Sequence, residues 1–153
     1  MLVAAYKANR HNIRKKPNAA VSLLDDDMEV LNLRNHYLGK ETGFRSFILA
    51  IPGASCLRSI DCTNCFLSLN DVTTLVGVAL SLPSLQILNI SQNEIFIEGG
   101  KQLLRLCQLN KEVVCVDGVN DDRALPYANY IPPRITCRIN KLLEVNMKQQ
   151  NQL

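Results

Sequence analysis

Two cysteines in the stretch LRSIDCTNCFLSLN, Cys62 and Cys65, have the Cys-x-x-Cys spacing used by zinc knuckles and dithiol redox sites. A structural zinc site needs a second pair of ligands, and the chain has no other Cys-x-x-Cys and no spaced pair of histidines. A redox site would need cations or a helix N-terminus beside the thiols, but the nearest charges are Asp61 and Arg58. The sequence therefore predicts no metal and no cofactor, and favours buried structural roles for both cysteines. The other cysteines are isolated, at Cys56, Cys107, Cys115 and Cys137.

Residues that could act as catalytic bases are scarce, since the only histidines are His11 and His36. The run Asp25-Asp26-Asp27 lacks the ligands that follow in a calcium loop, so a solvated linker is the better interpretation. No phosphate-binding glycine motif of the Gly-x-x-x-x-Gly-Lys-Ser/Thr type occurs. The sequence therefore predicts that the protein is not an enzyme and has no small-molecule substrate.

Composition limits the architecture that could position such residues. With 153 residues, 47% of them hydrophobic, the chain is long enough for one domain with a sizeable core. Its apolar runs are far shorter than the roughly 20 residues of a membrane-spanning helix, so we expect a soluble protein. The net charge is only +3, but Lys7, Arg10, Arg14, Lys15 and Lys16 precede the first acidic residue. We interpret this basic segment as a terminal helix with a solvated end, with a mitochondrial targeting segment as the alternative.

An apolar pattern recurs along the chain and predicts how it folds. The rungs begin at residues 28, 57, 85 and 113, which gives steps of 29, 28 and 28 residues. The clearest rung is Leu85-x-x-Leu88-x-Ile90-x-x-Asn93-x-Ile95. Cys62 and Cys65 take the positions of Ile90 and Asn93, and the fourth rung places Asp121 at the Asn93 position. The first rung likewise places His36 there, where a structural hydrogen bond is expected.

The second half of each unit has helical spacing. Leu103 and Cys107 are four residues apart after the third rung, and Leu75 and Ala79 repeat this after the second. In the first unit the same positions are displaced by one residue, which the step of 29 explains. Each unit therefore predicts a short strand, a turn and a returning helix, stable only when stacked on its neighbours.

This pattern resembles the leucine-rich repeat family, and its period is similar to that of the ribonuclease inhibitor-like class. The resemblance implies an α/β fold: a short leucine-rich repeat solenoid with parallel strands on the concave face, helices on the convex face and helical caps at both ends. It also implies use as a recognition scaffold. A looser resemblance, carried by RKKPNAAVSLL and KLLEVN, is to leucine-rich repeat proteins of protist flagella, including axonemal components.

The repeat predicts four segments. Residues 1–27 form an N-terminal helical cap, 28–121 the repeats, 122–147 a loop and C-terminal capping helix, and 148–153 a tail. The capping helix is expected over about Arg134 to Met147, because its apolar residues recur at helical spacing.

Side chains that alternate with the buried strand positions should face the concave side and offer a mildly polar surface for a protein partner. A neighbouring amide row could instead have only structural roles, laddering between coils. The residues predicted for partner binding are Asn32, Arg34, Asp61, Thr63, Asn89, Ser91 and Asp117.

We therefore expect a non-catalytic protein–protein interaction scaffold or adaptor, a structural subunit of a larger assembly. Its candidate setting is a flagellar axoneme or microtubule complex, in the cytoplasm, cytoskeleton or flagellum. The alternative is an RNA-associated subunit, such as a mitochondrial ribosome component, that contacts nucleic acid through Arg14, Lys15 and Lys16.

Overall fold

The computed structural model describes residues 28–36, 48–49, 51 and 55–153, and every structural statement below concerns these residues. The predicted N-terminal helical cap, residues 1–27, lies outside them. Arg14, Lys15 and Lys16 lie outside them as well.

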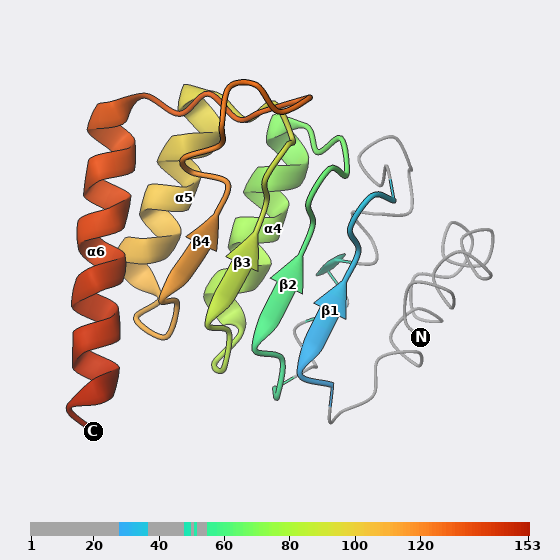
Figure 1. Cartoon of the computed structure of the whole chain (residues 1–153). Coiled ribbons are helices and arrows are strands. Elements are labelled where there is room, and N and C mark those ends of the chain that lie inside the picture. Colours follow the sequence, from blue (N-terminus) through green and yellow to red (C-terminus); the bar gives the residue numbers. More distant parts are fainter. Residues whose placement is uncertain (1–27, 37–47, 50, 52–54) are drawn as a thin grey trace.

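The described part of the chain is built on a sheet of four short parallel strands (Figure 1). The strands are β1 (Val30–Asn32), β2 (Ser59–Asp61), β3 (Ile87–Asn89) and β4 (Cys115–Asp117), and they pair in sequence order. Their register aligns Val30 with Ser59, Ile87 and Cys115. Paired residues are thus 29, 28 and 28 positions apart, the steps that the sequence predicts.

Alternation within each strand decides which side chains enter the core. The middle residues, Leu31, Ile60, Leu88 and Val116, are 0–4% exposed, while their neighbours turn toward the opposite face. Stacking of successive units buries these residues against one another, because a three-residue strand cannot shield its own apolar side chain.

Three helices of the described part of the chain form a second layer behind the sheet (Figure 1). Helix α4 (Leu69–Ser81) begins at a capping box: the backbone N–H of Asp71 donates to Ser68 Oγ (3.2 Å) and the backbone N–H of Ser68 to the Asp71 carboxylate (2.8 Å). Helix α5 (Ile97–Leu109) follows one unit later and packs between α4 and α6. The predicted inward positions of α4 and α5 are all buried: Leu75, Ala79, Leu103 and Cys107.

Helix α6 (Pro133–Asn151) lies beyond α5 at the end of the helix layer (Figure 1). Proline at its first position suits a helix start, because that N–H would have no partner within the helix. Ile135, Ile139 and Leu143 are buried against the rest of the fold. The helix includes four residues of the segment predicted as a tail, so it is longer than the sequence pattern indicates.

Buried asparagines tie each helix end to the next unit. Asn110 Nδ2 donates to the carbonyl oxygen of Ala79 (2.9 Å) at the end of α4. Asn146 Nδ2 in turn donates to the carbonyl oxygens of Cys107 (3.3 Å), near the end of α5, and Val113 (2.9 Å). The prediction of an α/β fold with parallel strands and 28–29 residue units is confirmed.

Candidate protein-interaction surfaces

The residues predicted for partner binding lie where the strands end, and several of them form the same turn in successive units. The side-chain oxygen of the last strand residue accepts a hydrogen bond from the backbone N–H two residues later. The pairs are Asn32 with Arg34 (3.1 Å), Asp61 with Thr63 (2.9 Å) and Asn89 with Ser91 (3.1 Å). Such turns satisfy backbone donors that have left the sheet, so these oxygens have a structural role.

Some of these residues also connect neighbouring units. Thr63 Oγ1 donates to Asn89 Oδ1 (2.8 Å), and Thr63 is only 2% exposed. The Ser91 hydroxyl donates to the carboxylate of Asp121. Asn32, Arg34 and Asp117 are exposed. An open depression of about 470 Å³ brings together five of the seven predicted residues: Arg34, Thr63, Asn89, Ser91 and Asp117.

The buried Asn93 side chain holds the turn between two units. Its Oδ1 accepts hydrogen bonds from the backbone N–H groups of Cys65 (3.0 Å) and Leu67 (3.2 Å). Its Nδ2 donates to the carbonyl oxygens of Cys62 and Ile90, both at 2.9 Å. One carboxamide therefore satisfies backbone N–H and carbonyl groups that the pairing of the strands leaves without partners.

In the next unit the side chain of Asn129 makes the equivalent hydrogen bonds. The prediction that Asp121 occupies this position of the repeat is therefore wrong. Asn129 Oδ1 accepts from the backbone N–H groups of Asn93 (3.0 Å) and Ile95 (2.9 Å). Its Nδ2 donates to the carbonyl oxygens of Ile90 (2.9 Å) and Gly118 (3.0 Å). Asn129 follows Asn93 by 36 residues, whereas Asn93 follows Cys65 by 28. Residues 121–128 are therefore an insertion, which we call the inserted loop.

The inserted loop crosses the edge where the strands lead into the helices (Figure 1), which we call the turn edge. The Tyr127 carbonyl oxygen accepts a hydrogen bond from the Glu94 N–H (3.0 Å). The Tyr127 ring lies 4.8 Å from that of Phe66, two units earlier. The loop thus covers one unit and reaches the next, and it places aromatic side chains at a surface that the regular repeat would leave polar.

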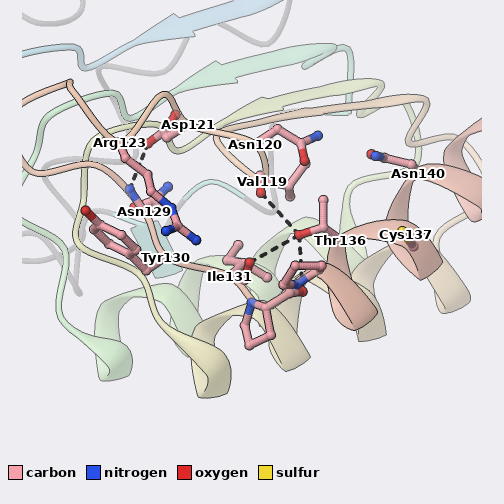
Figure 2. A pocket seen from close by; sticks show the side chains of 12 residues that line it. Val119, Asn120, Asp121, Arg123, Asn129, Tyr130, Ile131, Thr136, Cys137 and Asn140 are labelled. Carbon is pink, nitrogen blue, oxygen red and sulfur yellow. Dashed lines mark hydrogen bonds between the residues drawn. The ribbon is translucent and has the colours of Figure 1, made fainter.

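A hollow of about 440 Å³ lies between the end of β4, the inserted loop and the first turns of α6 (Figure 2). Thr136 Oγ1 lies within hydrogen-bonding distance of the carbonyl oxygens of Val119 (3.3 Å) and Ile131 (3.4 Å), which fixes α6 to the preceding chain. The guanidinium of Arg123 lies 5.5 Å from the centre of the Tyr130 ring. Arg123, Cys137 and Asn140 line the hollow without forming a nucleophile–base pair.

The two cysteines of the Cys-x-x-Cys are both fully buried. Cys65 Sγ donates to the carbonyl oxygen of Leu33 (3.0 Å). Hydrogen bonding with Cys65 and burial raise the pKa of the Cys62 thiol well above its ordinary value, so it remains protonated at neutral pH. No group of three or more potential metal ligands occurs among the residues that the structure describes. His36, at the corresponding turn position, contacts the Arg34 carbonyl oxygen through Nδ1.

The outward face of α6 is a basic surface that the sequence analysis missed. Four cations, at Arg134, Arg138, Lys141 and Lys148, are spaced by three, four or seven residues, with one acid, Glu144, on the same helix. This spacing places them along one exposed stripe, with Val145 in line. The sequence does carry this pattern, because the four cations occupy the side of the helix opposite to Ile135, Ile139 and Leu143.

The fold defines a class of small repeat proteins in which parallel strand–turn–helix units stack side by side. Several solved structures share it, among them two domains of other proteins. One is the tropomodulin C-terminal domain from Caenorhabditis elegans, with a TM-score of 0.56 and 15% identity over 90% of this chain and 96% of that chain. The other is leiomodin-1 actin-binding site 2, with a TM-score of 0.60 and 15% identity over 90% of this chain and 91% of that chain. No protein-family model and no curated protein sequence matches the chain.

These matches correct the resemblance drawn from the repeat pattern. The assignment to the ribonuclease inhibitor-like class, with its looser likeness to flagellar proteins, is wrong: the matched structures are tropomodulin and leiomodin domains. Neither match supports a flagellar protein or a mitochondrial ribosome component. Within the described residues, no helix is long and apolar enough to cross a bilayer.

Proposed function

We propose that this protein is a non-catalytic interaction module of the actin cytoskeleton, with actin as its partner. The observation that carries the proposal is the extent of the fold match, which spans 90% of this chain and 91% of the leiomodin-1 actin-binding site. At 15% identity the match establishes the fold alone, so the partner is a hypothesis for experiment.

The outward face of α6 is the contact surface we favour. It lies at the end of the helix layer, and its basic stripe combines Arg138 and Lys141 with the half-exposed apolar side chain of Val145. Arginine, lysine and partly exposed apolar groups together suit an acidic protein surface, because the cations accelerate encounter and the apolar groups add contact area.

The exposed face of the sheet is a second candidate contact surface. Asn32, Arg34 and Asp117 are the exposed members of the predicted set, so a partner that reached this face would meet them first. Asp61, Thr63, Asn89 and Ser91 are already engaged in turns. We therefore rank this face below α6.

We also propose that the complete chain is a short solenoid with a cap at each end. The segments are those predicted from sequence: 1–27 as N-terminal cap, 28–121 as repeats, 122–147 as loop and capping helix, and 148–153 as tail. The support is the position of α6 beyond α5, although α6 itself continues to Asn151.

Co-sedimentation with actin filaments, together with a fluorescence assay on monomeric actin, tests the function. We expect binding that weakens with salt and falls about tenfold or more when Arg138→Glu and Lys141→Glu are combined. The matched control combines Arg58→Glu and Arg105→Glu, exposed cations that lie before β2 and on α5, and should leave affinity unchanged. If the folded wild-type chain bound neither form of actin at low salt, the proposed partner would be wrong. Equal losses in both double variants would remove α6 as the contact surface.

A further inference from the structure

A groove between the first turns of α4 and α5 is a separate feature of the turn edge. It has a volume of about 380 Å³ and belongs neither to the outward face of α6 nor to the predicted concave set. It is lined by Leu67, Ser68, Leu69, Val72 and residues 93–99. We call it the turn-edge groove.

Exposed apolar side chains border this groove. Leu69, the first residue of α4, is 50% exposed, and Phe96, the N-cap residue of α5, is 58% exposed. All four aromatic residues of the described part of the chain lie at this edge, in the pairs Phe66–Tyr127 and Phe96–Tyr130. None of them is in the core. A contiguous exposed cluster of this kind marks an interaction surface more often than single scattered residues do.

The inserted loop brings an aromatic residue to this edge, because the Tyr127 ring lies 4.8 Å from that of Phe66. Phe66 has a φ angle of 54°, and Glu94, one unit later, has a φ angle of 52°. The left-handed conformation at this position therefore belongs to the repeated turn, whichever side chain it carries. The aromatic pair itself depends on the inserted loop, which is an addition to the regular repeat.

The charges around the groove are acidic. Glu94 and Glu98 are the only charged residues that line it, and both are exposed. Lys101 pairs with Glu98 (2.7 Å), while no cation is within ion-pair distance of Glu94 among the described residues. The neighbouring Tyr130 already accepts the Arg123 guanidinium on its face. An apolar groove with carboxylates on its rim complements a segment that combines apolar and cationic side chains.

We propose that the turn-edge groove docks a linear segment of another protein that carries one or two apolar anchors beside a lysine or arginine. The anchors contact Leu69 and Phe96, and the cation lies toward Glu94. This surface is separate from α6, so the proposal does not depend on actin binding.

Selection of random peptides displayed on phage against the immobilised full chain tests this proposal. Enriched peptides are then measured by fluorescence polarisation. We expect enrichment of peptides with leucine or phenylalanine next to lysine or arginine, and a loss of affinity of about tenfold with Phe96→Ser. Glu94→Lys should weaken basic peptides about threefold or more. Leu109→Ser and Glu112→Lys, exposed at the other end of α5, are the matched controls and should bind as the wild type does.

The outcomes separate this site from the proposed actin surface. Arg138→Glu with Lys141→Glu should leave peptide affinity unchanged while it reduces actin binding. No enrichment, or enrichment of acidic or uncharged peptides, would overturn the proposal. So would peptides whose affinity Glu94→Lys and Phe96→Ser leave intact. If Phe96→Ser failed to fold, Glu94→Lys, an exposed substitution, decides the question alone.

Discussion

Replacing Asn129 by alanine tests the central structural finding, that this residue and not Asp121 holds the fourth unit. The substitution removes the acceptor of two buried backbone N–H groups, those of Asn93 and Ile95, and the donor to two carbonyl oxygens. An unsatisfied buried donor costs about 1–3 kcal/mol. We therefore expect the free energy of unfolding to fall by about 3 kcal/mol or more, and the melting temperature by about 6–12 °C.

Urea unfolding followed by circular dichroism measures this loss, with Asn140→Ala on α6 as the matched control. Asn140 is half-exposed, and its replacement should change the free energy of unfolding by less than about 0.5 kcal/mol. Asp121→Asn gives the opposing test. The sequence register predicts that it restores a missing asparagine and stabilises the fold. The structure predicts a loss of about 1–2 kcal/mol, because the carboxylate accepts from Ser91, Gln92 and Asn129.

Unfolding of Asn129→Ala and Asn140→Ala at the same urea concentration would contradict this role of Asn129. A stabilising effect of Asp121→Asn would contradict it as well.

Three further predictions concern the core. Burial raises the pKa of the Cys107 thiol to about 12. The thiol therefore stays protonated in the folded state at pH values where the same thiol in the unfolded chain, with a pKa near 9, has lost its proton. The free energy of unfolding should therefore fall as pH rises from 9 toward 12, and Cys107→Ala should reduce that slope in urea titrations at pH 8 and 10.5. Gly118→Ala should cost about 2 kcal/mol or more in thermal unfolding, since φ is +102° and the new Cβ would lie 2.6 Å from the Ser91 nitrogen. Cys62→Val should leave actin and peptide binding unchanged, and a selective loss of binding would reopen a role for this thiol.

Much of the fold was predictable because apolar residues recur at the same positions of successive repeats, where they meet the same local structure. Leu31, Ile60, Leu88 and Val116 recur at the strand spacing and are buried in register. Cys62 and Cys65 likewise match Ile90 and Asn93, which explains a motif that resembled a metal site. The inserted loop interrupts the period, so the repeat pattern places the fourth turn asparagine eight residues too early.

The candidate surfaces were less predictable. The concave set was chosen by alternation alone, which shows the direction of a side chain but not what it bonds to. Asp61 and Thr63 form a local turn, and Thr63 also donates to Asn89 of the next unit. The second contact depends on the distance between units. The basic stripe of α6, in contrast, is encoded in the spacing of Arg134, Arg138 and Lys141, on the side of the helix opposite its apolar residues.

By itself, the sequence determined the period, the parallel strand–turn–helix units and the burial of the Cys-x-x-Cys, because each follows from local spacing repeated along the chain. Only the tertiary structure decided that Asn129 replaces Asp121 and that Tyr127 meets Phe66. Both facts depend on how an inserted loop folds back across other units. Such contacts join residues far apart in the chain, and no repeat spacing encodes them.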